Sequence, residues 1–574
     1  MSTNIAVKFI GYDIHNSIEK TFRYSNNGIT EDIFDAVDSY YAPYITNSIV
    51  LKQVATEVKD DAISIVLSND RGLDDFTDYA FEGRSLIAYV EIAGTYHLLW
   101  TGKIEKVSIE QKSVTVKGKS HFDVLDNIIN PTTFTGNLVT DPYDGDEELL
   151  NKNKPRLIGS AFNIKPVLLN ASKLIYGFNW DVDGNRTSSN GIFVIRDGGL
   201  PLFDSGTSLV RSESKYVDGT DEFATINTYN QSRNFDTTAN MDAFTPTPTA
   251  GSYYTCFAES SFKLGSKPIY EITMDLDNSF TYGEFIREVC EENNIASYSI
   301  HSSPDYSIGG YFTSQTSYKK ANQFLAQNLD VHLWFDSALS LNVKLAQDNG
   351  VSPVAHFIEA GMDYASAISI AFSNIKKNKY TKPYKSISLG YKKNYTLQNE
   401  SSLAGKAVAD LDADIIYNKT FLTAEKEKDW GSVYVIENTL EIESSISNLT
   451  NATTEVDRIF DKSGDTNYGI DYFSITCSLL EDLEGMVLGI VPEGVSDQVD
   501  FSNTSIDIET SSYTMDNDNG IFIGTIKTLL IGDPIFLTSD TFSYSSARGI
   551  VDSLLVDTQK MTITYGIEIP RLVA

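Results

Sequence analysis

The sequence is poor in the residues that build metal sites and disulfide frameworks. It has 3 cysteines among 574 residues, Cys256, Cys290 and Cys477, and its 6 histidines are dispersed with no HExxH motif. An odd number of widely separated cysteines provides neither a disulfide framework nor metal-ligand spacing. We therefore expect no metal and no cofactor, and we expect synthesis in a reducing cytoplasm.

Long apolar runs and clustered positive charge are also missing. The apolar runs are far too short to span a bilayer, and we expect no signal sequence because the N-terminus lacks a basic-then-apolar pattern. The net charge of −33 argues against sequence-independent binding of nucleic acid, since phosphate contacts need clustered Lys and Arg. The acidity has two interpretations: a surface that keeps a large protein soluble, or acidic walls past which DNA slides without sticking.

Recognisable catalytic motifs are absent. No Gly-x-Ser-x-Gly turn or phosphate loop occurs, and 78 acidic residues offer too many carboxylate pairs for any pair to mark a glycan-cleaving site. Asp181–Asn185 and Asp516–Gly520 resemble the starts of calcium loops. Their twelfth positions are Ile192 and Lys527, where a bidentate Glu is required, so both are expected to be tight turns. We predict no catalytic, cofactor-binding or metal-binding residues and no enzyme activity.

What the chain has in abundance is the composition of β-structure. It contains 32 Tyr and 30 Phe with many Thr, Ser and Asn, which favour strands and their loops. A hydrophobic content of 41% against 21% charged residues indicates a folded chain, and 574 residues exceed what one core usually organises. The expected fold is therefore mainly β, a multidomain α+β architecture.

Periodicity divides the chain into four expected domains. Residues 1–135 alternate apolar and polar residues, which predicts a small antiparallel barrel or sandwich. Residues 136–270 form a β-rich insertion, with long polar surface loops expected over 204–252. Residues 271–350 form a small α+β domain, and strands return over 351–574.

Helices are expected at three places. Thr281 and Glu284 form a capping box ahead of an apolar helical face. A second helix is predicted over 317–328, followed by a hairpin over 332–343. Within the last domain, apolar residues at helical spacing predict one amphipathic helix near 441–460.

The two ends of the chain carry similar β-hairpins. Residues 102–116 align without a gap on residues 549–563, and residues 83–87 similarly match 532–536. In the closing strand, Met561, Ile563, Tyr565, Ile567 and Ile569 alternate with polar residues, which predicts one face in a core. A unit used twice, far apart, indicates internal pseudo-symmetry, although two amphipathic hairpins also look alike by chance.

Several short segments along the chain form a recognisable series. They are Ser68–Phe76 with Asp78, Tyr79 and Phe81–Arg84, then Phe134–Gly136, Lys154–Gly159, Phe162–Leu168, Ile175–Tyr176, Arg196–Leu202, Ile387–Thr396 and Leu403–Gly405. In order and spacing these segments resemble the tail baseplate hub proteins of long-tailed bacteriophages and of phage-like gene transfer particles. The polar stretch near 204–255 has no counterpart in that family.

The resemblance implies a structural virion protein with two tube-like antiparallel β-barrels, the hub barrels of 1–135 and 351–574. It implies a homotrimer that closes the tail tube at the phage tail tip, assembled in the bacterial host cytoplasm. The implied partners are the distal tail or tail tube protein ring, other tail-tip proteins and central fibre proteins, with transient passage of phage DNA without specific binding. Three chains with two similar barrels each would adapt a six-fold tube to a three-fold tip.

Two other functions stay open at this point. A receptor-binding or carbohydrate-binding tail protein would use the polar loops near 204–255, with Tyr40–Tyr44 or Tyr253–Tyr254 as possible aromatic platforms. A tail-associated peptidoglycan hydrolase is less favoured, because its nucleophile or metal motif is missing.

Overall fold

The computed structural model describes most of the chain. The described residues are 4–31, 39–47, 49–54, 63–69, 74–92, 95–188, 192–204, 235–301, 303–335, 341–345, 355–359, 369–372, 374–404, 418–428, 438–463, 467–478, 487–490, 514–516, 521–523, 532–557, 560 and 562–572. As the composition predicts, the protein is mainly β, with few helices. Among the described residues, no helix is long and apolar enough to cross a membrane.

The N-terminal part of the chain forms a sheet that curls into a barrel. Its strand order is β3-β4-β2-β1-β8-β9-β10-β6, with β7 beside β1. The strands are β1 (Ile5–Asp13), β2 (Ile18–Ser25), β3 (Ile29–Glu31), β4 (Ser39–Pro43), β6 (Ile63–Ser68), β7 (Tyr79–Ala80), β8 (Ser85–Ile92), β9 (Thr95–Ile109) and β10 (Ser113–Lys119).

The segment that follows β4 closes this barrel. The Ile45 N–H donates to the Ser25 carbonyl at the end of β2, at 2.9 Å. On the other side of the segment, the Thr46 N–H donates to Val66 of β6, at 2.9 Å, and the Ser68 N–H donates to Tyr44, at 2.7 Å. This segment therefore pairs with β2 on one side and with β6 on the other, which closes the sheet into a barrel.

The C-terminal part forms a second sheet of the same kind, with strand order β26-β25-β35-β36-β37-β31-β27. β26 pairs with β25 at one end of this sheet, and β27 pairs with β31 at the other end. Because one residue separates β26 from β27 along the chain, the two ends of the sheet lie together and the ring closes. The strands are β25 (Ala355–Glu359), β26 (Ser369–Phe372), β27 (Asn374–Thr381), β31 (Asn467–Ser478), β35 (Pro534–Ser539), β36 (Tyr544–Asp557) and β37 (Thr562–Leu572).

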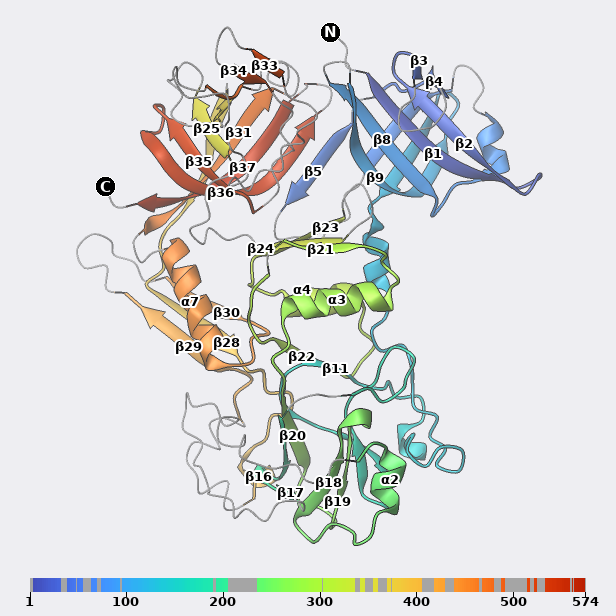
Figure 1. The fold of residues 1–574 in the computed structure, drawn as a ribbon, viewed down its shortest axis with the longest axis vertical. Coiled ribbons are helices and arrows are strands. Elements are labelled where there is room, and N and C mark those ends of the chain that lie inside the picture. The colour runs from blue at the N-terminus through green and yellow to red at the C-terminus, as the bar shows by residue number, and fades with distance from the viewer. Residues whose placement is uncertain are drawn as a thin grey trace.

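The two barrels lie side by side at one end of the molecule, the first blue and the second yellow to red in Figure 1. Both interiors belong to one hydrophobic cluster that runs from Ile5 to Ile569. The alternation predicted for the closing strand is confirmed, since Ile563, Tyr565 and Ile567 are buried while the residues between them are partly exposed. Met561 lies outside the described residues.

The middle of the molecule contains two of the predicted helices. α3 (Tyr282–Glu292) begins at the predicted capping box, with both the Thr281 and the Glu284 side chains engaged. α4 (Tyr318–Leu325) is capped by Ser317 and is shorter than predicted. The predicted hairpin is also present, as two strands of a small sheet formed by β21 (Tyr298–Ile300), β23 (Val331–Phe335) and β24 (Leu341–Leu345).

The helix expected near 441–460 begins later than predicted. α7 spans Leu449–Ser463, and the Asn448 side chain accepts from the Asn451 N–H at 2.9 Å, the contact typical of a helix start. Upstream, β30 (Thr439–Glu443) pairs in parallel with β28 (Ser386–Tyr391), so Ile442 lies on a strand. The apolar spacing across this junction imitated one continuous helix.

This last helix belongs with the middle of the molecule rather than with the second barrel. Ala452, Val456 and Phe460 of α7 are buried in the same cluster as α3 and α4. β28, β30 and β29 (Leu422–Glu427) contribute to that cluster as well. The hydrophobic cores therefore cut across the four blocks drawn from the sequence.

Among the described residues, the part of the molecule farther from the barrels holds three small sheets and one short α-helix. The helix is α2 (Thr238–Ala243), which lies within the stretch expected to be a surface loop; residues 205–234 of that stretch lie outside the described residues. The strands are β11 (Arg156–Gly159), β12 (Ala161–Ile164), β13 (Val167–Asn170), β14 (Ile175–Gly177), β15 (Ile192–Asp197), β16 (Leu200–Pro201), β17 (Phe203–Asp204), β18 (Ser252–Cys256), β19 (Ser261–Leu264), β20 (Ile272–Asp277) and β22 (Gly309–Phe312).

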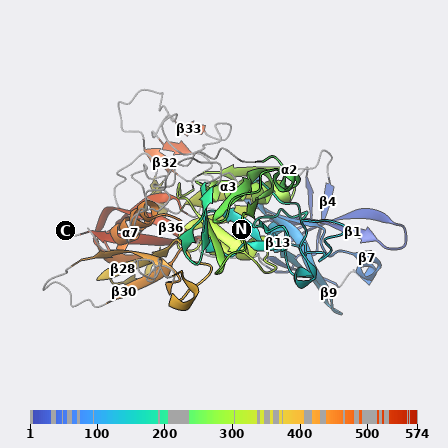
Figure 2. The ribbon, with the colours of Figure 1, turned by 90° about the horizontal axis from the view of Figure 1, so that it is seen from below.

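Seen from below, the green middle elements lie at the centre and the two barrels extend to either side (Figure 2). A further sheet on the second barrel's side consists of β32 (Val487–Ile490), β33 (Thr514–Asp516) and β34 (Ile521–Ile523). The described part of the chain thus places two similar barrels on one side of a mixed α/β body.

Candidate functional site

The two barrels repeat a unit of four strands, and this repeat is the candidate functional feature. β6, β8, β9 and β10 of the first barrel correspond in order and direction to β31, β35, β36 and β37 of the second. Gly102 pairs with Leu86, and Gly549 pairs with Ile535, as the alignment of the two hairpins requires.

The backbone hydrogen bonds at the start of the unit repeat atom for atom. The Gly83 N–H donates to Ile104 at 2.8 Å, and the equivalent Gly532 N–H donates to Val551 at 2.8 Å. In the reverse direction, Ile104 donates to Arg84 at 2.7 Å and Val551 donates to Asp533 at 3.0 Å. Both glycines have a positive φ, +78° and +86°, a conformation that strains other residues.

A β-bulge also falls at the same place in both units. Glu105 is the extra residue of β9, because Lys117 and Gly118 pair with Lys106 and Ile104. Asp552 is the extra residue of β36, at the position that the hairpin alignment equates with Glu105. Since bulges are specific local features rather than a general property of hairpins, two chance hairpins would not share one.

The second strands, however, do not match in the gapless register expected from the sequence. Ile109 pairs with Val114, leaving four residues between them, whereas Val556 pairs with Ile563, leaving six. The second turn is thus two residues longer, and Val114 corresponds to Ile563 instead of Met561. An even shift keeps every side chain on its original face, which is why the error was invisible in the apolar pattern.

The two barrel cores place large and small side chains at opposite members of equivalent residue pairs. In the first barrel, small Ala88 faces large Trp100; in the second, the equivalent Leu537 faces Ala547. A Cβ on Gly118 would lie 2.6 Å from the Trp100 ring. The second barrel has no tryptophan there, and Ile567 takes the place of Gly118. Each core therefore reaches close packing by its own combination.

One strand of the N-terminal part crosses into the second barrel. β5 (Val50–Val54) pairs antiparallel with β36, Gln53 opposite Leu554 and Leu51 opposite Val556. It lies between the barrels in Figure 1. The first half of β36 pairs with β35 on the same side, so β5 extends the sheet where β35 ends. The two barrels are therefore joined by a backbone ladder.

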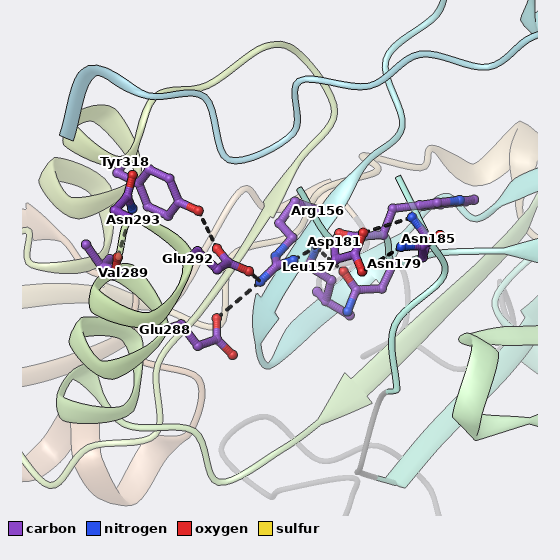
Figure 3. Close-up of polar contacts among 11 residues, drawn as sticks. Arg156, Leu157, Asn179, Asp181, Asn185, Glu288, Val289, Glu292, Asn293 and Tyr318 are labelled. Carbon is purple, nitrogen blue, oxygen red and sulfur yellow. Dashed lines mark hydrogen bonds and ion pairs between the residues drawn. The ribbon is translucent and has the colours of Figure 1, made fainter. Parts of the chain in front are cut away.

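A buried charge cluster braces the body below the barrels (Figure 3). Arg156 of β11 reaches across to α3, where its guanidinium contacts Glu292 at 2.8 Å and Glu288 at 3.4 Å. Tyr318 of α4 donates to Glu292. Burial opposes the charge on Arg156, but the two carboxylates outweigh it and raise the pKa of that side chain. Burial and the neighbouring Glu292 also raise the pKa of Tyr318.

This cluster holds elements together and offers no reactive group. Arg156 is 6% exposed, and its guanidinium also donates to the Trp180 carbonyl at 3.2 Å. Loss of Arg156 would leave the largely buried Glu292 without its cation, and breaking a buried pair in this way typically costs about 3–5 kcal/mol. The arrangement fits a fixed junction between the body's sheets and helices.

The calcium-like segment Asp181–Asn185 is a tight turn, as expected. The Asp181 carboxylate accepts from the Asn185 N–H at 2.8 Å, and the Asp181 N–H donates back to the Asn185 carbonyl at 2.9 Å. Of Asp516–Gly520, only Asp516 lies within the described residues. Within the described ranges, no group of three or more His, Cys, Asp or Glu side chains is placed to hold a metal ion.

The aromatic segments considered as sugar platforms are largely buried. Tyr41, Tyr253 and Tyr254 are at most 7% exposed, whereas Tyr40 is 59% exposed. The three cysteines are all buried, and none of them forms a disulfide. Burial raises the pKa of the Cys290 thiol to about 12, so this thiol is unreactive at neutral pH.

The four acidic residues considered for a channel wall differ in environment. Glu105 and Glu110 of the first hairpin are exposed, and Asp552 and Asp557 of the second are partly covered. Asp557 pairs with Lys560 at 2.8 Å and also accepts from its N–H at 3.1 Å, so it holds the turn. Of these four carboxylates, the two of the first hairpin are thus the more exposed.

No protein-family model matches the chain, and no curated protein matches it in sequence. Among solved structures it is similar to the tail protein from Neisseria meningitidis MC58, at 8% identity and a TM-score of 0.39, over 99% of this chain and 97% of that one. It is similar to the prophage MuSo2 43 kDa tail protein from Shewanella oneidensis, at 9% identity and a TM-score of 0.38, over 93% and 96%. A chain of a native gene transfer agent virion matches at 10% identity and a TM-score of 0.18, over 51% and 84%.

Proposed function

We propose that this protein is a structural component of a bacteriophage tail tip, a homotrimeric baseplate hub that closes the tail tube. The observation that carries the proposal is the repeated four-strand unit, with its equivalent hydrogen bonds and its equivalent bulges. Three chains with two such units each present six similar surfaces around a three-fold axis. That arrangement matches a six-membered tube ring to a three-fold tip within closed symmetry.

In this proposal the barrels of 1–135 and 351–574 form the ring, and 136–270 and 271–350 form the body that faces tip and fibre proteins. The distal tail or tail tube ring sits on the barrels, and phage DNA passes through the ring during ejection. A net charge of −33 supports passage without adhesion, because carboxylates repel the phosphate backbone. The proposed role needs no catalysis.

The experiment is to fuse a small tag to the chain, purify intact particles and count and locate the tag. The proposal expects three copies per particle, all at the tail end distal to the capsid. A copy number of six or one, or labelling along the tail or at the capsid, would contradict it. Purified protein that digests cell wall would show a hydrolase instead, and a glycan-array signal lost on deleting 204–255 would show a carbohydrate-binding protein.

A further inference from the structure

We propose that the edge of β9 formed by residues 105–110 is the docking site for a second copy of this chain, which adds a strand there by backbone pairing. This inference rests on the trimeric ring proposed above and identifies the contact through which the copies join.

The argument begins with the equivalent edge in the second barrel. There, β5 pairs with β36 from Ser553 to Asp557. The hairpin alignment equates these residues with Lys106 to Glu110 of β9. Along the first half of β9, β8 pairs up to Lys103, as β35 does along β36. Beyond that point, no strand among the described residues pairs with β9 on the side away from β10.

The direction of the backbone groups supports an open edge. The Glu110 N–H donates to Ser113 of β10 at 2.8 Å, so Glu110 faces its hairpin partner. Because successive residues of a strand alternate, the N–H and C=O groups of Ile109 and Val107 face the other way. Their counterparts in β36, Val556 and Leu554, are the residues opposite Leu51 and Gln53 of β5.

Side chains along the edge of β9 are also more exposed than their counterparts along the edge of β36. Leu554 is 7% exposed, while its counterpart Val107 is only partly buried. Ser553 and Asp557 are partly buried, while Lys106 and Glu110 are exposed. Ile109 is 39% exposed. The same structural unit is covered in one barrel and uncovered in the other.

The occupant follows from the geometry of an alternating ring. The edge of β36 faces the first barrel of its own chain, which donates β5. If the two barrels alternate around the ring, the quasi-equivalent edge of β9 must face a second barrel, and that barrel belongs to the neighbouring copy. Strand addition to an open edge is a common mode of recognition, and an edge left open invites pairing.

The test uses the full chain and the substitution Ile109→Pro. Proline removes the outward N–H and is tolerated on an edge where that N–H has no partner within the sheet. The matched control is Ile109→Ala, which shortens the same side chain but keeps the N–H. We expect I109P to remain folded by circular dichroism and to lose the trimer by native mass spectrometry, and I109A to remain trimeric.

A trimer of normal strength in I109P would overturn the docking site while leaving the trimeric hub intact. Absence of a trimer in the wild-type chain and in assembled particles would overturn the hub itself. If I109P fails to fold, a benzoyl-phenylalanine at Lys106 in a mixture of heavy and light isotope-labelled chains decides. Mixed-isotope crosslinked peptides support the proposal; crosslinks within one chain only, or to other proteins only, refute it.

Discussion

The first barrel pairs its four-strand unit with an antiparallel strand, whereas the second uses a parallel one at the matching place. β1 runs antiparallel to β8, but β25 runs parallel to β35, and β26 runs parallel to β25. The four shared strands nevertheless keep the same order, the same bulge and the same glycine turn. The difference shows which part of the barrel is fixed by its own residues, and which part adapts to the connections around it.

The shared unit is fixed because its apolar alternation and its special backbone positions agree with each other. Ile63, Ile65 and Leu67 of β6 and their counterparts Phe473, Ile475 and Cys477 of β31 are all buried to 2% exposure or less. The strands outside the unit lack such a shared pattern. Local consistency of this kind specifies one structure more strongly than pattern alone.

The largest expected effect comes from placing a charge in either core. Val114→Asp and Ile563→Asp occupy equivalent, buried positions and bury an unpaired carboxylate, at a cost of several kcal/mol by usual desolvation arithmetic. We expect both variants to lose the cooperative unfolding transition seen by calorimetry. The controls are the matched neighbours Thr115→Asp and Thr564→Asp, which point to the partly exposed face and should fold. Equal damage from core and control substitutions would show that the register is wrong.

The next largest effect on stability comes from changing the large and small side chains that differ between the two cores. Trp100→Ala should cost about 3–5 kcal/mol, because the emptied space cannot collapse fully. Gly118→Ile alone should also destabilise, since its side chain would meet Trp100, Ile63 and Leu86. Combined, the two substitutions reproduce the residue types of the second barrel, Ala547 and Ile567, at the equivalent positions of the first. We expect the double variant to be more stable than either single variant in urea unfolding; additive losses would contradict the equivalence.

A smaller effect is a dependence of stability on pH that arises from the second barrel. His356 of β25 is buried, its Nε2 lies 2.7 Å from the Thr538 hydroxyl, and burial lowers its pKa. An unfolded histidine takes up a proton near pH 6.5. The unfolded chain therefore binds the proton first, and the stability that neutral His356 contributes is lost as the pH falls below about 6.5.

His356→Gln removes this titration and leaves a group able to hydrogen-bond. The difference in free energy of unfolding between the wild-type chain and the variant should favour the wild type less at pH 5.5 than at pH 7.5. A difference that stays constant over this interval would show that His356 keeps an ordinary pKa in the folded barrel.

The smallest expected effect is none at all. Purified protein should not shift double-stranded DNA in a gel at low salt, the condition under which any basic patch binds most strongly. Glu105→Lys and Asp552→Lys change equivalent bulge residues. If the barrels are quasi-equivalent in a channel, the two substitutions should change the binding of double-stranded DNA by the same amount. Binding by the wild-type chain would reveal a basic surface and leave the net charge as a solubility feature.

The sequence predicted the β-rich class, the paired hairpins, the capping box at Thr281 and the inward face of the closing strand. The sequence-based prediction was wrong about the start of α7 and about the length of the second hairpin turn. Ile442 and Ile446 continued the apolar spacing of α7, and only the cap at Asn448 marks the true start. The two extra residues in the second turn were hidden because an even shift preserves alternation.

Other features had no local signal. The junction of Arg156 with Glu288 and Glu292 joins residues more than 130 positions apart, as the separations of 132 and 136 show. The pairing of β5 with β36 is longer in range still. Such contacts depend on the assembled fold, and no spacing within one segment predicts them.

The central claim is that two equivalent barrels from each chain alternate in one ring. A reconstruction of the intact tail tip by cryo-electron microscopy, without imposed symmetry, tests it most directly. The account predicts three copies, with six barrels at one level and with β36 and β9 each facing the neighbouring barrel. Barrels at two different levels, or copies that do not alternate first and second barrels around the axis, would contradict it.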